Sequence, residues 1–175
     1  MKKTFLLLLA AAMWVFAGAT TIPTFPDRVF NIKDYYNGKD TIYTAAINNA
    51  IIDCSKQGGG KVLIPKGEYL TGPIHLKSNV HLHMEDGVVL RFSTDPRLYE
   101  PIVLTRIEGA DCYNLSPLIY AYGQENIAIT GKALLDGQAT AANWLDPHNM
   151  YYHLQPDGRT ARDKTQLVEM NNAKV

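Results

Sequence analysis

The sequence predicts an all-β solenoid, a stack of coils built from short strands, preceded by a single capping α-helix. Three observations support this fold class. Most apolar runs after residue 60 are three to five residues long and end at Gly, Asn, Asp or Pro. Convincing helical periodicity is confined to residues 41–56. A pattern of strand, bend and strand recurs after about 47 residues.

Length and composition limit the class of protein. The chain has 175 residues, with 17 basic residues, 17 acidic residues and a hydrophobic content of 46%. The balanced charge gives no basic excess for nucleic acid, and the hydrophobic content excludes a fully disordered chain. The length allows one domain or part of a larger one.

Residues 1–19 have the pattern of a signal peptide. Lys2 and Lys3 precede an uncharged apolar run over residues 5–16, which is shorter than the roughly 20 residues that span a bilayer. Ala-Gly-Ala then supplies a cleavage site of small residues. We expect a secreted protein, periplasmic or extracellular, whose mature chain (20–175) starts near Thr20 and has no membrane anchor. An uncleaved short anchor is the alternative.

The helix is expected over residues 41–56, where Asp40 or Thr41 can cap its N-terminus. Three glycines at 58–60 end it. Its apolar stripe repeats at i, i+3, i+4 and i+7 and consists of Ile47, Ala50, Ile51 and Cys54. We expect this stripe to cover the open end of the first coil.

Short strands account for most of the remaining sequence. They are expected at residues 29–33, 61–65, 68–70, 74–76, 80–84, 88–92, 118–122, 127–129 and 133–135. Two stretches, 95–113 and 139–162, are less regular and are interpreted as long excursions from the coil, where binding residues usually lie. A β-sandwich is the alternative fold, although it favours longer alternating strands and hairpin turns.

The repeat suggests how the coils stack. Residues 78–82 (Ser-Asn-Val-His-Leu) and 125–129 (Glu-Asn-Ile-Ala-Ile) are each followed by a glycine-containing bend and a second apolar strand. An Asn at the start of each, Asn79 and Asn126, favours Asn side chains stacked at a bend.

The order of these features resembles the polygalacturonases, the pectin-active proteins of glycoside hydrolase family 28. The resemblance covers residues 28–145 and is clearest at 30–35, at 58–80 and at 127–138. The last segment is similar to the family's I-x-G-x-G-x-I-D-G-x-G rung, with Ala133 at its second glycine. The resemblance implies the N-terminal part of a right-handed parallel β-helix, truncated before the later coils.

The resemblance also implies a chemistry, which is inverting hydrolysis of pectic polygalacturonate or rhamnogalacturonan without a cofactor. The family's motifs Asn-Thr-Asp, Asp-Asp, Gly-His-Gly and Arg-Ile-Lys are absent from the sequence. The tripeptides most similar to them, at 93–95 (Ser-Thr-Asp) and 106–108 (Arg-Ile-Glu), precede the rung at 136–137 rather than follow it. We therefore expect no catalytic residue in this chain and no activity of the chain alone.

Three further groups of residues could take part in binding or in structure, and each has two interpretations. Trp144, after the last recognisable rung, can stack on a sugar ring of a pectic polysaccharide or pack its loop onto the coil. His81 and His83 share one strand face and can hold a metal or form a packed ladder. The cysteines Cys54 and Cys112 can be bridged or simply buried.

Two functional alternatives stay open. A non-catalytic β-helix, such as a carbohydrate-binding or adhesin module, would have similar first coils. A calcium-dependent pectate lyase is disfavoured by the Asp136-Gly137 rung and by the lack of carboxylates at calcium-binding spacing; the pair at 85–86 (Glu-Asp) is interpreted as a solvated turn. No Cys/His spacing resembles a zinc site.

Overall fold

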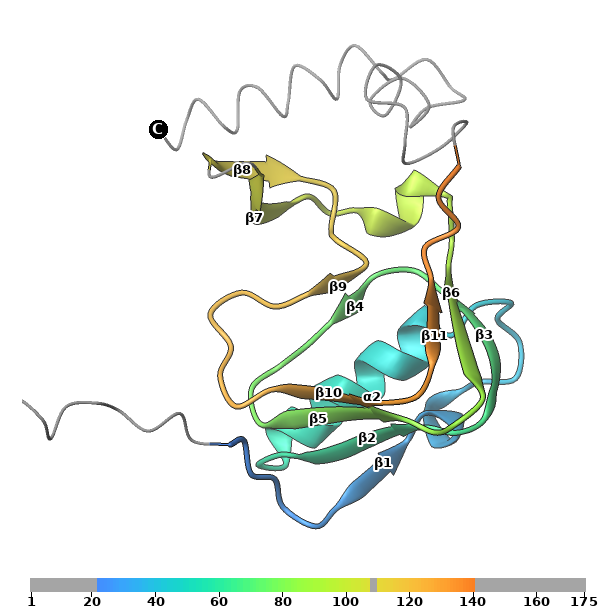
Figure 1. The fold of residues 1–175 in the computed structure, drawn as a ribbon, viewed down its shortest axis with the longest axis vertical. Coiled ribbons are helices and arrows are strands. Elements are labelled where there is room, and N and C mark those ends of the chain that lie inside the picture. Colours follow the sequence, from blue (N-terminus) through green and yellow to red (C-terminus); the bar gives the residue numbers. More distant parts are fainter. Residues whose placement is uncertain (1–21, 108–109, 141–175) are drawn as a thin grey trace, which may run out of the picture.

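The structure, a computed structural model, describes residues 22–107 and 110–140, and it is mostly strand (Figure 1). The expected signal peptide and Trp144 lie outside these residues. The elements are β1 (Val29–Asn31), η2 (Ile32–Tyr35), α2 (Thr44–Lys56), β2 (Gly60–Ile64), β3 (Gly67–Thr71), β4 (Ile74–His75), β5 (Val80–Met84), β6 (Val88–Phe92), η3 (Pro96–Tyr99), β7 (Val103–Ile107), β8 (Ala110–Asn114), β9 (Ile119–Tyr120), β10 (Ala128–Gly131) and β11 (Leu134–Asp136).

Three parallel sheets organise the described part of the chain. Their strand orders are β1-β2-β5-β10, β11-β6-β3 and β4-β9. The chain passes through the three sheets in turn as β2, β3 and β4, and then again as β5, β6 and β9 (Figure 1). Each passage lays its strands beside those of the previous one, which excludes the antiparallel β-sandwich considered from the sequence.

The register of the first sheet follows the sequence repeat. His81 of β5 lies between Lys61 of β2 and Ala128 of β10, so the repeated segments are neighbours in space. Asn126 Nδ2 donates to Asn79 Oδ1 at 2.9 Å, and the two residues have φ values of 53° and 64°. Asn tolerates this left-handed conformation better than most residues. The expected stack of Asn side chains at a bend is confirmed.

The apolar stripe of helix α2 (Ile47, Ala50, Ile51 and Cys54) packs against strands of the coil. All four stripe residues are fully buried, and the helix contacts β1, β2, β4 and β5. In Figure 1 it crosses the triangle enclosed by β2, β3 and β4. The inward residues of the strands complete one hydrophobic core, which includes Val62, Ile64, Ile74, Val80, Leu82, Val88, Leu90 and Phe92. The expectation that the stripe would be buried against the coil is therefore confirmed.

The expected start of the helix is wrong by three residues. The helix begins at Thr44, and neither Asp40 nor Thr41 caps it. Asp40 instead belongs to a turn organised by Asn37, whose Oδ1 accepts from Asp40 N at 3.1 Å. Tyr43 precedes the helix without a side-chain cap, and its backbone N–H donates to Leu70 O at 2.8 Å. A contact with β3, rather than local capping, therefore sets the start of the helix.

Residues 95–113 leave the coil as expected but are more regular than expected. After η3, strands β7 and β8 form an antiparallel hairpin in which Arg106 lies opposite Asp111. The hairpin projects from the coil between β6 and β9 (Figure 1). No helix among the described residues is long and apolar enough to cross a bilayer.

Candidate functional site

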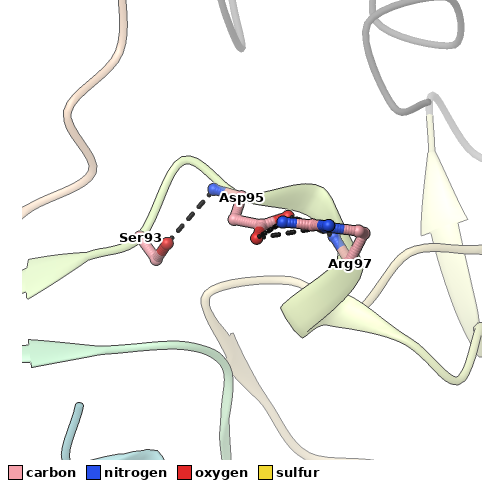
Figure 2. Close-up of polar contacts among 3 residues, drawn as sticks. All are labelled: Ser93, Asp95 and Arg97. Atoms are coloured by element: carbon pink, nitrogen blue, oxygen red, sulfur yellow. Dashed lines mark hydrogen bonds and ion pairs between the residues drawn. The ribbon is translucent and has the colours of Figure 1, made fainter. Parts of the chain in front are cut away.

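Asp95, the acidic residue of the Ser-Thr-Asp tripeptide, serves as a helix cap. Its Oδ1 accepts from Arg97 N at 3.1 Å, and the Arg97 guanidinium binds both carboxylate oxygens at 2.6 to 3.2 Å (Figure 2). Asp95 N donates to Ser93 Oγ at 3.1 Å. The hydrogen bond from Arg97 lowers the pKa of Asp95. A general acid needs a raised pKa, so Asp95 is set up for structure rather than for proton donation.

Asp136 of the rung that resembles the family motif belongs to an ion-pair ladder. Arg91 lies between Glu68 and Asp136 on the outer face of the second sheet, with N–O distances of 3.3 and 3.6 Å. Asp136 Oδ1 also accepts from Gln138 N at 2.9 Å, while Gln138 Nε2 donates to Phe92 O at 2.7 Å. The rung thus ties β11 to β6, and exposed ion pairs of this kind contribute little each to stability.

The acidic pair at the bend after β5 behaves as a solvated turn. Glu85 and Asp86 are both exposed, and Glu85 Oε2 accepts from Lys66 N at 2.9 Å. This expectation from the sequence is met. Glu108 of the Arg-Ile-Glu tripeptide lies outside the described residues.

The two histidines of β5 are joined by a hydroxyl. Thr130 Oγ1 lies 2.6 Å from His81 Nε2 and 2.7 Å from His83 Nδ1, and the Phe25 ring stacks on His81. Burial lowers the pKa of His81, with smaller contributions from His83 and Lys61. No group of three or more His, Cys, Asp or Glu side chains in the described segments is placed to hold a metal. The arrangement is a side-chain ladder across β5 and β10.

A serine–histidine pair that no sequence motif predicts lies between β4 and the segment before β9. His75 Nε2 is 2.9 Å from Ser116 Oγ, and the same hydroxyl donates to Pro117 O at 3.0 Å. The single hydroxyl proton goes to a carbonyl that can only accept, so His75 Nε2 donates to Ser116. Nucleophilic activation needs the opposite direction, with histidine accepting the proton. The pair therefore joins two segments and does not form a reactive serine.

The surroundings of His75 reinforce this structural role. Its backbone N–H donates to Asn48 Oδ1 of α2 at 2.9 Å. Burial lowers the pKa of His75, and Lys77 lowers it further. The pair was not detectable in the sequence because its members are 41 residues apart and neither belongs to a motif.

The cysteines are two free thiols. Cys54 is fully buried in the helix stripe, and burial raises its pKa to about 11. Such a thiol stays protonated and unreactive at neutral pH. Of the two interpretations of the cysteines, the structure has the unbridged one.

Among the described residues, a candidate ligand site is an open groove between the β7–β8 hairpin and β9, with a volume of about 530 Å³. Its lining includes Leu104, Thr105, Arg106, Asp111, Tyr120 and Tyr122. Tyr120 Oη donates to Leu104 O at 2.7 Å and thereby joins β9 to β7. Tyr122 is 62% exposed. The sequence predicts an excursion at residues 95–113, but no motif marks the tyrosines of this groove.

Known proteins resemble this chain in sequence and in structure. No family model matches it. It is 31% identical over 127 residues to an exo-poly-α-D-galacturonosidase of Dickeya chrysanthemi, and the match covers 67% of this chain and 21% of that protein. A hyperthermoactive exopolygalacturonase from Thermotoga maritima is 41% identical with a TM-score of 0.66, over 86% of this chain and 34% of its own. The chain is a relative of the family 28 polygalacturonases.

A second solved relative gives the same assignment. The family 28 exopolygalacturonase of Yersinia enterocolitica is 31% identical with a TM-score of 0.51, over 63% of this chain and 21% of its own. The polygalacturonase relatives are right-handed parallel β-helices, in agreement with the parallel sheets of this chain. The chain spans between a fifth and about a third of the length of these relatives.

Proposed function

We propose that this chain forms the first coils of a right-handed parallel β-helix in a secreted glycoside hydrolase that acts on pectic polygalacturonate or rhamnogalacturonan. The main support for the proposal is that the chain is 41% identical to the Thermotoga maritima exopolygalacturonase over 86% of its length and has a similar fold there. Neither an adhesin module nor a pectate lyase is favoured by these relatives.

The proposed reaction is hydrolysis with inversion. It needs one carboxylic acid to protonate the leaving oxygen and one carboxylate to activate water, with the two groups about 6.5–9.5 Å apart. Asp95 and Asp136 are instead held by Arg97 and Arg91, and these carboxylates lie in a cap and a ladder. We place the catalytic carboxylates outside the described residues. The coils formed by residues 22–140 then provide the scaffold and part of the substrate path.

An exchange of segments tests this division of roles. In a chimera, residues 22–140 replace the matching segment of the Thermotoga maritima enzyme, and release of reducing ends from polygalacturonate is measured. We expect activity from the chimera and none from the 175-residue chain alone. The matched control is the Thermotoga maritima enzyme with the same segment deleted, which should be inactive. Turnover by the chain alone that survives Asp95→Asn would contradict the proposed location of the active site.

Secretion is proposed from residues 1–19 and is tested separately. N-terminal sequencing of exported protein should give a start at Thr20. Exported material that begins at Met1 would contradict cleavage.

Trp144 is proposed as a stacking residue for a pectic sugar, because an indole offers a large flat contact area for little loss of rotamer freedom. It lies outside the described residues. In a chimera extended to residue 175, Trp144→Ala should weaken oligogalacturonate binding and Trp144→Phe should largely preserve it. Unchanged affinity with a lower melting temperature for Trp144→Ala would assign the indole to loop packing.

A further inference from the structure

Residues 22–28 form a strap that crosses the first sheet. The strap, dark blue in Figure 1, precedes β1 and runs from it toward the bend before β10. Its Arg28 O accepts from Lys61 N of β2 at 2.8 Å, and its Thr24 O accepts from Asn126 Nδ2 at 3.0 Å. The strap therefore joins β2 to the bend that leads into β10, across the intervening β5.

One aromatic contact holds the strap between these two ends. Phe25 is partly buried, whereas residues 22–24 and 26–28 are exposed. The Phe25 ring stacks on the His81 imidazole of β5, with the centroids 5.2 Å apart and the planes at 29° to each other. A segment that buries so little apolar area opens at a low cost in free energy, so a modest change at His81 is enough to move it.

The side chains around His81 disfavour its charged form. The Thr130 hydroxyl of β10 joins His81 to His83 on the same strand, and Lys61 is the register partner of His81 on β2. Lys61 is a cation and His83 becomes one on protonation, while β10 (Ala-Ile-Thr-Gly) has no titratable side chain. The Phe25 ring of the strap covers one side of the imidazole. A proton on His81 is therefore opposed from β2 and β5 and shielded from water by the strap.

The carboxylates of the neighbouring segments do not reverse this effect. Asp27 of the strap and Glu125 of the bend before β10 are both exposed. The Arg28 guanidinium donates to Gln57 O after α2, away from β5. The pKa of His81 is lowered by burial first and by His83 and Lys61 next. When the docked form has the lower pKa, it loses stability relative to the released form as the pH falls below about 6.5.

We propose that residues 22–28 are a pH-dependent strap, which is docked on the sheet while His81 is neutral and is released when His81 takes up a proton. The imidazolium also attracts the Phe25 ring, but this attraction is small at an exposed site, and release restores the hydration of the charge. Release frees Asn126 from Thr24, while the hydrogen bond from Asn126 to Asn79 stays in place. The coils therefore remain stacked. This behaviour does not depend on the proposed catalytic activity.

The test is an NMR titration of the full chain from about pH 7.5 to pH 5.5, which spans the ordinary pKa of histidine. It follows the side-chain amide group of Asn126, which donates to both Thr24 O and Asn79 Oδ1. The proton facing Thr24 should move to the shift of a free amide with a midpoint below about 6.5, and the proton facing Asn79 should not move. Nuclear Overhauser contacts between the Phe25 and His81 rings should disappear over the same range. The ratio of docked to released strap changes about tenfold for each unit by which the two pKa values of His81 differ.

Four variants separate the charge of His81 from its ring contact. His81→Phe keeps an aromatic surface that does not titrate and should hold the strap docked throughout the titration. His81→Gln removes the ring and should leave the strap released at every pH. His83→Gln should move the midpoint to higher pH, because His83 lowers the pKa of His81. The matched control His75→Gln removes a histidine from β4, in another sheet, and should leave the midpoint unchanged.

Three outcomes overturn the inference. A Phe25–His81 contact and a Thr24-facing proton that both persist to pH 5.5 show that the strap does not respond to pH. Release of the strap in His81→Phe with the same midpoint as in the unchanged chain assigns the response to another group. Parallel movement of both Asn126 protons shows that the coils separate rather than the strap. Circular dichroism at each pH confirms that the chain is folded.

Discussion

Replacing Gly131 with alanine tests the stacking of β10 on β5. Gly131 has φ +119°, and a Cβ on it would lie 1.9 Å from Met84 O and 2.8 Å from Met84 C. Met84 is the register partner of Gly131, so the obstacle is backbone in a paired strand and cannot rotate away. The positive φ alone costs about 1–2 kcal/mol for an alanine. Relief of the clash requires the end of β10 to separate from β5, and each lost hydrogen bond costs about 0.5–1.5 kcal/mol more.

We therefore expect Gly131→Ala to lower the free energy of unfolding by about 3 kcal/mol or more. The matched control is Gly123→Ala, because Gly123 also has a positive φ, +62°, but a methyl group added to it would meet no atom within 4 Å. It should lose only about 1 kcal/mol. Both are measured by urea unfolding followed by circular dichroism. If the two variants lost stability equally, backbone strain alone would explain the effect and the close approach of β10 to β5 would be refuted.

Three further predictions concern the core and its titratable groups. Ile51→Asp should lower the free energy of unfolding by several kcal/mol, because Ile51 is fully buried. The control Asn49→Asp, on the exposed face of the same helix, should change it by less than about 0.5 kcal/mol. Comparable losses in the two variants would contradict the packing of α2. Thiol titration should find Cys112 reactive in the folded chain and Cys54 reactive only after denaturation; a chain without free thiols in denaturant would contradict the unbridged pair. Burial lowers the folded pKa of His75 below its unfolded value of about 6.5, so the unfolded chain binds the proton first. Stability should fall as the pH drops through about 6.5, and less steeply in His75→Gln; parallel pH profiles would refute this assignment.

The sequence was most informative where the chain repeats. The spacing between Asn79 and Asn126 predicted which strands are neighbours, because an Asn at each bend and an apolar strand after it must recur in register for the coils to stack. Ala133 stands where the family pattern has glycine and is accommodated because it packs, partly buried, against the core. These features depend on local pattern, so one sequence is enough to show them.

Features that depend on contacts between distant segments were less predictable. The helix starts late because Tyr43 bonds to β3, a contact that local capping preferences cannot reveal. The groove was not predicted because Leu104 belongs to the excursion and Tyr120 to a coil strand, and the two meet only after β9 pairs with β4. Trp144, the residue proposed from the sequence, lies outside the described part, so it stays a prediction.

The hairpin insertion shows how the scaffold separates architecture from recognition. The step from β2 to β5 is 20 residues, and the step from β5 to β10 is 47, yet the three strands pair without interruption. Chain closure depends only logarithmically on length, so the longer step adds less than about 1 kcal/mol of closure entropy. Evolution can therefore lengthen, replace or remove the segment between β6 and β9 at little thermodynamic expense, and substrate preference can diverge among homologues while their coils stay superimposable.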